Sequence, residues 1–371
     1  MSRLERMIRW EYIERNGLHL LATPDTTKLM EEVRQKIQWM LDLAHSANES
    51  LYPQREVTTQ TYSEYEMFAS WDPIETLRES VRGKHVWTFS DPHGDFKKDE
   101  LSINDKYAHD KLLLSAVRDN GAKTTNLVMS SFIGARQDKT TPRKRQPISV
   151  KQMAEELGRI TGENGYIFVT DLHNPSSEAN FRDTNLINFY TGWFVKKAIE
   201  RAGFKEEDII LLPADEGGIK KIEGISKDIG CKSLKVIKTR DLETKNKVDE
   251  VTIIWDIEWK DIIIHDDILD TGGTLCNLLT ELLKKNPKSI TVCITHGMLN
   301  GKALQKVWEV MVNSQGKIKK IFISDSINKE DLPEWIEVIP TSNILANNIT
   351  NIFQGFPVDR WDDNDYLKQV N

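Results

Sequence analysis

Short apolar runs alternate with longer segments of helical periodicity along most of the chain. Apolar runs bounded by polar or turn residues predict strands at 86–89, 126–130, 166–170, 209–212, 234–237, 262–264, 289–294, 320–323 and 335–340. Apolar residues at spacings of three and four predict helices at 27–45, 107–116, 148–160, 193–202, 219–229 and 275–283. Strands that alternate with helices of this length are typical of an α/β fold with mainly parallel sheets flanked by helices.

The alternation occurs in both halves of the chain, so the sequence predicts two similar α/β domains. We place an N-terminal extension at 1–17, an N-terminal α/β domain at 18–190, a C-terminal α/β domain at 191–343, and a C-terminal segment and tail at 344–371. Polar stretches predict long loops at 46–66, 90–105 and 134–146. Ligands of open α/β sheets lie at the carboxyl ends of the strands, so candidate chemistry is expected there.

The stretch from Ile262 to Leu275 is the first candidate ligand site. Three apolar residues lead into the adjacent carboxylates of Asp266 and Asp267, followed by the turn Asp270-Thr271-Gly272-Gly273-Thr274 and an apolar helical pattern. This order predicts a buried strand, a tight loop and a helix N-terminus, whose free N–H groups and dipole suit a phosphate monoester. The two acids could hold ribose hydroxyls. An ordinary strand–turn–helix junction is the alternative, but the acids, glycines and threonines together favour a phosphate site.

Two further acidic clusters follow predicted strands. Asp171 and His173 stand two residues apart, so they can face the same way and hold Mg²⁺ or a nucleotide phosphate. On spacing alone, a capping Asp and an ordinary His at a strand end are the simpler interpretation. Asp215 opens the turn Asp215-Glu216-Gly217-Gly218. Its acids could bind Mg²⁺ or ribose hydroxyls, or they could be ordinary charges at a helix N-terminus.

Two basic clusters stand out in an acidic chain. The loop Ala135-Arg136-Gln137-Asp138-Lys139, followed by Arg143, Lys144 and Arg145, carries guanidinium groups that suit a polyphosphate. A solvated charged loop is the alternative. Lys238 and Arg240 follow a predicted strand and could direct two cations at a transferring phosphoryl group, although Lys-Thr-Arg alone is uninformative.

Composition narrows the class of protein. The chain has 371 residues, of which 39% are hydrophobic and 29% are charged, as expected of a soluble globular protein. A formal net charge of −7 disfavours a nucleic-acid backbone as a general partner. Three scattered cysteines fit neither a disulfide framework nor a zinc cluster and favour a reducing cytoplasm. No apolar run approaches the roughly 18 residues of a membrane span, and the first residues lack an apolar signal core.

Together these segments resemble the ribose-phosphate diphosphokinase family, also called phosphoribosyl diphosphate (PRPP) synthetases. The resemblance covers roughly residues 18–357, and plain phosphoribosyltransferases share only the loop at 266–274. The matching segments follow one another in the family's order: Glu79-Ser80-Val81-Arg82-Gly83, Asn104-Asp105, Ala135-Arg136-Gln137-Asp138-Lys139, Pro147-Ile148-Ser149, Asp171-Leu172-His173, Asp215-Glu216-Gly217-Gly218, Lys238-x-Arg240, the loop at 266–274, Thr295-His296-Gly297 and Asp325-Ser326-Ile327.

The resemblance implies two phosphoribosyltransferase-type domains, ATP as co-substrate with Mg²⁺, and a homo-oligomer, either a dimer or a hexamer. Family members move the β,γ-diphosphoryl group of ATP to the anomeric hydroxyl of ribose 5-phosphate, giving PRPP and AMP. The implied ATP-binding residues are Phe68, Ser70, Asp72, Arg136, Gln137, Asp138 and His173. The implied ribose-5-phosphate-binding residues are Asp266, Asp267, Asp270, Thr271, Gly272, Gly273 and Thr274. The implied metal ligands are Asp171, His173 and Asp215, and the implied catalytic residues are Lys238, Arg240 and His173.

The chain departs from the family pattern mainly on the nucleotide side. The family's Phe-x-(Asn/Asp)-(Gly/Gln)-Glu element aligns with Phe68-Ala69-Ser70-Trp71-Asp72, and the loops at 46–66 and 90–105 are longer than usual. Three hypotheses remain. The favoured one is a divergent PRPP synthetase. The second keeps the same transfer but uses a larger ribose 5-phosphate ester such as ADP-ribose, as in phage NAD⁺-rebuilding pathways. The third is a non-catalytic, regulatory relative that binds true synthetase subunits.

Overall fold

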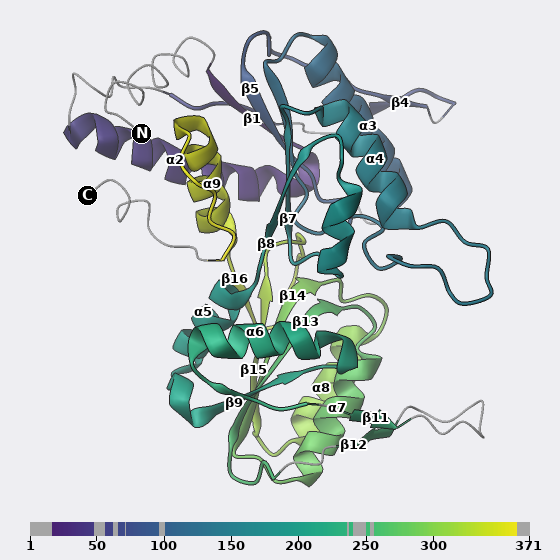
Figure 1. The fold of residues 1–371 in the computed structure, drawn as a ribbon, viewed down its shortest axis with the longest axis vertical. Helices are drawn as coiled ribbons and strands as arrows, with labels where there is room; N and C mark the ends of the chain where they lie inside the picture. Colours follow the sequence, from purple (N-terminus) through teal and green to yellow (C-terminus); the bar gives the residue numbers. More distant parts are fainter. Residues whose placement is uncertain are drawn as a thin grey trace. The chain divides into compact units, whose positions relative to one another are not determined.

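The computed structural model describes residues 17–47, 56–61, 66–70, 72–95, 101–235, 237–239, 250–252 and 256–361. The chain divides into two compact units (Figure 1). The first contains Met1–Tyr190, Ser326–Glu330 and Pro340–Asn371, and the second contains Thr191–Asp325 and Asp331–Ile339. The chain therefore leaves the first unit at Tyr190 and returns to it twice.

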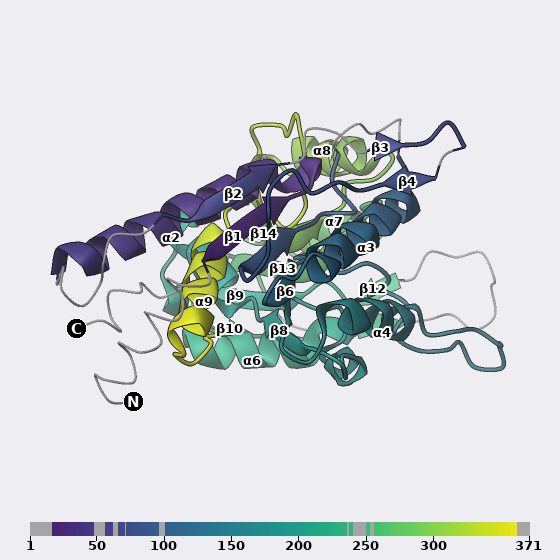
Figure 2. The ribbon, with the colours of Figure 1, turned by 90° about the horizontal axis from the view of Figure 1, so that it is seen from above.

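The first unit is built on a six-stranded sheet in the order β2-β1-β5-β6-β7-β8, with every neighbouring pair parallel. Figures 1 and 2 show α3 and α4 side by side along this sheet. Helices α2 and α9 cross each other away from that pair. Its strands are β1 (Leu18–Ala22), β2 (Thr58–Thr61), β5 (His85–Phe89), β6 (Thr124–Val128), β7 (Tyr166–Thr170) and β8 (Asn185–Phe189). Its helices are α2 (Thr27–Ala47), α3 (Ile103–Asp119), α4 (Ser149–Thr161) and α9 (Ser342–Gln354), with 3-10 turns η1 (Pro24–Thr26) and η2 (Pro175–Asn180).

Large aromatic side chains fill part of the core of this unit. Trp87, Phe168 and Phe189 are fully buried on three strands of the sheet. The ring centroids of Trp87 and Phe168 lie 4.5 Å apart, and those of Phe168 and Phe189 lie 5.0 Å apart in an edge-to-face pair. Because such pairs add to the free energy of burial, they fix these strands against one another.

The second unit is built on a six-stranded parallel sheet in the order β10-β9-β13-β14-β15-β16. Leucines of α7 and isoleucines and valines of five of these strands form one continuous apolar cluster. The strands are β9 (Ile209–Pro213), β10 (Lys232–Ser233), β13 (Asp261–Leu269), β14 (Ser289–Gly297), β15 (Ile318–Ser324) and β16 (Ile336–Ile339). The helices are α5 (Gly192–Ala202), α6 (Ile219–Ile229), α7 (Gly273–Lys284) and α8 (Ala303–Asn313), with 3-10 turns η3 (Glu206–Asp208) and η4 (Glu216–Gly218).

The two units share one topology. If the strands of each sheet are numbered along the chain, both sheets have the order 2-1-3-4-5-6. In each unit a two-stranded antiparallel hairpin interrupts the connection between the second and third strand of the sheet. These hairpins are β3 (Glu66–Met67) with β4 (Pro73–Ile74), and β11 (Ile237–Thr239) with β12 (Glu250–Thr252).

The predicted fold class is confirmed, because both sheets are parallel and flanked by helices. Most predicted strands and helices occur within a few residues of their expected bounds. No helix of the described residues combines the length and the apolar character that a membrane crossing requires. The predicted extension at 1–17 and the tail of the chain lie almost wholly outside the described residues, which begin at residue 17 and end at residue 361.

Three strand predictions are wrong. The stretch predicted as a loop at 46–66 contains β2. This strand consists of Thr and Gln residues, so it gives no apolar signal. It lies at the edge of the sheet and is held through polar contacts, such as the one between His19 Nδ1 and Thr58 Oγ1 at 2.8 Å. Strand β8 was not predicted, since polar residues at Asn185 and Asn188 interrupt its apolar pattern. The predicted strand at 234–237 falls between two strands instead: β10 ends before it at Ser233, and β11 begins at its last residue, Ile237.

Gly165 tests the packing between β7 and its neighbours. A Cβ atom built there overlaps the backbone carbonyl oxygens of Thr125 and Thr161, which cannot move as a side chain end could. We expect Gly165→Ala to lower the free energy of unfolding by about 1–3 kcal/mol, as other overpacked sites do. Gly192→Ala is the matched control, because a Cβ there meets no atom within 4 Å. Urea denaturation measures both, and equal stabilities of the two variants would contradict the prediction.

Candidate functional site

The glycine-rich loop of the second unit connects β13 to α7. Strand β13 ends at Leu269, and α7 begins at Gly273. Gly272 precedes the helix with φ 77°, a left-handed conformation that glycine adopts without the steric cost of a side chain. The helix is anchored by buried Leu275, Leu278, Leu279 and Leu282, so its N-terminus is fixed where the loop ends. The first N–H groups of such a helix lack partners within the helix and point toward this loop.

Residues that follow β14 hold the loop in shape. Asn300 donates its backbone N–H to the Asp270 carbonyl (3.0 Å) and its side-chain amide to Asp270 Oδ1 (2.9 Å). Lys306 Nζ of α8 donates to the Thr271 carbonyl at 3.2 Å. Thr271 and Thr274 are exposed. The loop therefore keeps its turn conformation while its hydroxyls face solvent, the arrangement that a phosphate monoester needs.

Three carboxylates gather near the carboxyl ends of the adjacent strands β9 and β13. Asp266 and Asp267 are half-buried, and Asp267 donates its backbone N–H to Asp266 Oδ1 at 3.1 Å. Burial raises the pKa of Asp266 well above its usual range, and the charges of Asp267 and Asp215 raise it further. Strand β13 is longer than the predicted run at 262–264, so these two acids lie within the strand. Concentrated negative charge of this kind favours a cation or sugar hydroxyls as a ligand.

Asp215 begins the turn that precedes α6. Its Oδ1 accepts a hydrogen bond from the Gly217 backbone N–H at 2.8 Å, which makes it the N-cap of η4. The charge of Lys221 lowers the pKa of Asp266, so the cluster has a cation beside it. This capping contact supports the interpretation of Asp215 as an ordinary charge at a helix N-terminus. It uses one carboxylate oxygen and leaves the second for other contacts.

One of the two predicted catalytic cations belongs to the hairpin of the second unit. Lys238 lies in β11, where it pairs with Val251 of β12. Arg240 lies outside the described residues. The structure thus places Lys238 on a hairpin that stands apart from the six-stranded sheet.

His265 is a buried residue that the sequence did not indicate. Its Nδ1 lies 3.0 Å from the Cys293 carbonyl, and its Nε2 lies 3.0 Å from the Thr191 hydroxyl. Because a carbonyl only accepts, Nδ1 donates to Cys293. The imidazole thus fixes β13 directly before its two acids. The sequence signal was a single polar residue within an apolar strand.

In the first unit, the loop after β7 carries the other predicted metal ligands. Asp171 is buried with φ 53°, and His173 is exposed. Asn174 donates to Asp138 Oδ2 at 2.6 Å. This hydrogen bond joins the Asp171–His173 loop to the basic loop that follows β6, so the structure brings Asp138 and His173 into one neighbourhood.

The basic loop has a structural contact that the sequence did not predict. Gln137 Oε1 accepts from the Ser149 backbone N–H (2.9 Å) and from the Ser149 hydroxyl, and its amide group donates to the Pro147 carbonyl. Gln137 therefore ties the loop to the start of α4, while Arg136 is exposed beside it. Gln137 remains predicted as an ATP-binding residue, and its contacts with Ser149 and Pro147 give it a positioning function.

The hairpin of the first unit carries Phe68, Ser70 and Asp72 at its tip. Phe68 donates its backbone N–H to the Asp72 carbonyl at 2.9 Å, and the Ser70 hydroxyl lies 2.5 Å from Asp72 Oδ2. The Phe68 side chain is 60% exposed. An aromatic ring held on a closed turn and exposed to solvent can stack on a base.

Magnesium fits the donor types of both units, since it prefers carboxylate oxygens and commonly uses one or two of them together with substrate phosphates. Asp171 and Asp215 supply such oxygens. Within the described residues, no three His, Cys, Asp or Glu side chains come together as a preformed metal site.

Known proteins match this chain over both units. A model of the N-terminal domain of ribose phosphate pyrophosphokinase matches residues 18–160, and a phosphoribosyl transferase domain model matches residues 193–326. The ribose-phosphate pyrophosphokinase of Agrobacterium fabrum is 28% identical over 305 residues, 81% of this chain and 90% of that protein. The chain belongs to the ribose-phosphate pyrophosphokinase family. Ribose-phosphate pyrophosphokinase 1 of Streptococcus pneumoniae is 26% identical over 284 residues, 76% of this chain and 83% of that protein.

The fold agrees with this assignment. Phosphoribosylpyrophosphate synthetase from Mycobacterium smegmatis has a TM-score of 0.72 at 21% identity, over 91% of this chain and 99% of that one. The chain is thus a divergent ribose-phosphate pyrophosphokinase family member and an enzyme of the diphosphotransferase type.

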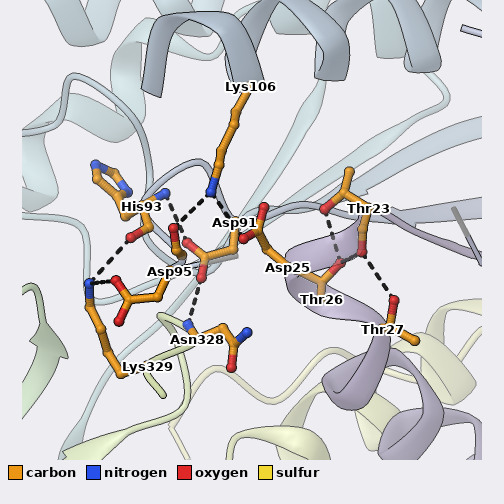
Figure 3. A network of polar contacts seen from close by, with 11 residues as sticks. Thr23, Asp25, Thr26, Thr27, Asp91, His93, Asp95, Lys106, Asn328 and Lys329 are labelled. Atoms are coloured by element: carbon orange, nitrogen blue, oxygen red, sulfur yellow. Dashed lines mark hydrogen bonds and ion pairs between the residues drawn. The ribbon is translucent and has the colours of Figure 1, made fainter. Parts of the chain in front are cut away.

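A buried polar network at the carboxyl ends of β1 and β5 lies outside the motifs shared with the family (Figure 3). Lys106 of α3 is 3% exposed, and its Nζ donates to Asp25 Oδ1 (3.0 Å) and to the Gly94 carbonyl (2.7 Å). Asp91 accepts from the backbone N–H groups of His93 (3.1 Å) and Asn328 (2.6 Å). The network therefore anchors the returning segment Ser326–Glu330 to the first unit.

The same region contains a buried acid that has no cationic partner among the described residues. Asp110 of α3 is 1% exposed, and the group beside it is the Ser90 hydroxyl. Burial raises the pKa of Asp110 to about 8, and the charges of Asp25, Glu75 and Asp91 raise it further. Burial likewise raises the pKa of Asp91 to about 7. Both acids are thus partly or largely protonated near neutral pH.

The raised pKa of Asp110 predicts how stability changes with pH. Between the ordinary value of 3.8 and about 8, the folded chain binds more protons than the unfolded chain, so stability falls as pH rises through that range. We expect Asp110→Asn to become more stable relative to the natural chain as pH rises. The difference between their free energies of unfolding should shift in favour of the variant by at least about 1.4 kcal/mol between pH 5 and pH 8.5, the free energy of one pKa unit.

The control for this prediction is Asp105→Asn on the same helix. Hydrogen bonds from Ser102 lower the pKa of Asp105, so it titrates below this pH range. Its urea-denaturation curves should therefore keep a constant difference from the natural chain between pH 5 and pH 8.5. Parallel pH profiles for Asp110→Asn and the natural chain would refute the assignment of a protonated Asp110.

Proposed function

We propose that this enzyme transfers the β,γ-diphosphoryl group of ATP to the anomeric hydroxyl of ribose 5-phosphate, giving PRPP and AMP. The observation that carries the proposal is the loop from Asp270 to Thr274, with its left-handed Gly272, its helix N-terminus and the acid pair on the preceding strand. The family of the chain, in which relatives are named ribose-phosphate pyrophosphokinases, supports it.

The residues take the following roles. The loop Asp270–Thr274 binds the 5-phosphate, because its N–H groups and the dipole of α7 attract an anion. Asp266 and Asp267 accept hydrogen bonds from the ribose hydroxyls. Burial raises the pKa of Asp266, and a bound cation or the ribose hydroxyls would favour its ionised form.

On the nucleotide side, Arg136 and His173 bind the ATP phosphates, and Phe68 stacks on the adenine. Asp171, His173 or Asp215 would hold Mg²⁺, which would supply positive charge to the phosphates. Ser70 and Asp72 are already joined to each other, so the hairpin tip offers the nucleotide a preformed turn. We propose that the enzyme forms a homo-oligomer, either a dimer or a hexamer.

Attack of the anomeric hydroxyl on the β-phosphorus of ATP needs positioning and cations more than covalent help. Lys238, on the second-unit hairpin, and Arg240 supply that charge. The bond that breaks joins the α- and β-phosphates, so AMP leaves with the electron pair.

A larger acceptor, ADP-ribose, is the second candidate. Its terminal ribose has the same anomeric hydroxyl, and an anhydride bond joins its 5-phosphate to a second phosphate. The exposed rim of the phosphate loop favours this candidate, because Thr271 and Thr274 face solvent and Lys306 reaches the Thr271 carbonyl from the side. A second phosphate leaving the loop would meet that lysine.

An AMP-release assay with ATP and Mg²⁺ tests the proposal. Ribose 5-phosphate and ADP-ribose are compared as acceptors, and the products are identified by mass. Turnover mainly with ribose 5-phosphate is the expected result. Turnover mainly with ADP-ribose would establish the second candidate, and silence with both in folded protein would favour a regulatory relative that binds true synthetase subunits.

The hairpin cations give a separate prediction. We expect Lys238→Ala or Arg240→Ala to lower kcat by at least about 100-fold, because a single electrostatic donor of this type is worth that much in comparable enzymes. The melting temperature should not change. Lys235→Ala serves as the control, since Lys235 pairs with Glu223 at 3.1 Å on the surface of the same unit. A near-normal kcat in either hairpin variant would remove its catalytic role.

A further inference from the structure

A chain of polar contacts leads from the C-terminal part of the first unit to the Asp171–His173 loop. We call Asp359, Arg360 and Trp361 the C-terminal clasp. The backbone of Asp359 is held at both ends by Asn348 of α9, which accepts from its N–H (2.8 Å) and donates to its carbonyl (2.9 Å). The clasp is therefore anchored to a helix before it meets the sheet.

The clasp lies along β8, the edge strand of the sheet. The Arg360 carbonyl accepts from the Tyr190 N–H at 2.8 Å, and its guanidinium donates to the Leu186 carbonyl at 3.1 Å. The rings of Trp361 and Tyr190 stack with centroids 4.0 Å apart and 14° between their planes. These contacts cover an edge that would otherwise offer its backbone groups to another chain.

The guanidinium of Arg360 also forms an ion pair with Glu178 of η2. Arg360 Nη1 donates to Glu178 Oε2 at 3.2 Å. Glu178 Oε1 accepts from the Tyr190 hydroxyl and from the Asn188 side-chain amide, each at 2.9 Å. The carboxylate therefore joins the clasp to a residue inside the sheet.

Asn188 completes the connection. It is 1% exposed, and its Oδ1 accepts from the Leu172 backbone N–H at 3.1 Å. Because Glu178 takes the amide N–H, the orientation of Asn188 is fixed and its oxygen must face Leu172. The peptide that separates Asp171 from His173 is thus held by a side chain whose direction depends on the clasp.

The loop needs this support because its backbone is unusual. Asp171 has φ 53°, a conformation that side chains other than glycine rarely adopt. Its own N–H donates to the Phe189 carbonyl at 2.9 Å, so β8 holds the loop through one backbone contact and one side-chain contact. Loss of the side-chain contact would let the Leu172 peptide rotate and change where Asp171 and His173 point.

We propose that Arg360, Glu178 and Asn188 are positioning residues that set the geometry of the Asp171–His173 loop for ATP. The inference rests on the proposed function, because it assumes that this loop binds the ATP phosphates or their Mg²⁺. Outer contacts that orient ligating groups typically change metal affinity or activity by 10- to 100-fold when removed. A clasp that only covered the sheet edge would affect stability and leave ATP affinity unchanged.

The experiment compares Arg360→Ala and Glu178→Gln with a matched control, Arg201→Ala. Arg201 makes the same pair of contacts in the second unit, donating to Glu337 Oε1 (2.9 Å) and to the Val338 carbonyl of β16 (3.1 Å). Titration calorimetry of the full chain with MgATP gives its Kd. We expect both clasp variants to raise that Kd by roughly 10-fold and to leave the KM for the acceptor unchanged, while Arg201→Ala changes neither.

Amide hydrogen exchange separates this inference from the proposed function. In Arg360→Ala, exchange across 171–174 should become faster, and Arg201→Ala should leave it unchanged. If the natural chain does not bind MgATP, the proposed function fails while the exchange rates still decide whether the clasp orders the loop. Unchanged exchange, or an unchanged Kd for MgATP in folded clasp variants of an ATP-binding chain, would overturn the proposal.

Discussion

Parallel pairing of the strands is the constraint on which the rest of the structure depends. A parallel neighbour requires the chain to cross back over the sheet, so every strand of a unit ends at the same edge. In the first unit this edge collects Asp91, the basic loop after β6 and the Asp171–His173 loop. In the second unit it collects Asp215, the two acids of β13 and the glycine-rich loop. Within each unit, residues far apart in sequence thus come to the same edge of the sheet, where contacts such as Asn174 to Asp138 join them.

The concentration of carboxylates at these edges has an energetic cost that the structure meets in different ways. In the second unit, burial and two neighbouring charges raise the pKa of Asp266, and the charge of Lys221 opposes them. In the first unit, Lys106 sits between Asp25 and the Gly94 carbonyl as an internal cation. Asp110 has no such cation and is kept neutral instead. A bound cation would therefore stabilise the acids around Asp266 in the second unit. In the first unit, Lys106 and the protonation of Asp110 already reduce the negative charge.

The sequence was most informative where local chemistry decides the structure. The apolar run before Asp266 and the glycines after Asp270 sufficed to predict a strand, a loop and a helix N-terminus, because each depends on its own residues. Strand β2 was missed because a polar edge strand is defined by its partner. The Arg360–Glu178 contact and the tie from Gln137 to Ser149 join distant residues through geometry that no local pattern encodes. The parallel fold was predictable, and the contacts that orient its loops were not.

The matching positions of the two hairpins have a consequence for how such a chain can diverge. Each hairpin is inserted between the second and third strand of its sheet, and neither contributes a strand to that sheet. Its length and composition can therefore change without shifting the register of any core strand. Two units that share a strand order and an insertion point are the expected product of internal duplication, after which each copy's hairpin acquires its own chemistry. One copy carries an exposed aromatic ring and the other a lysine, so a change of substrate could arise at these points while both cores stay as they are.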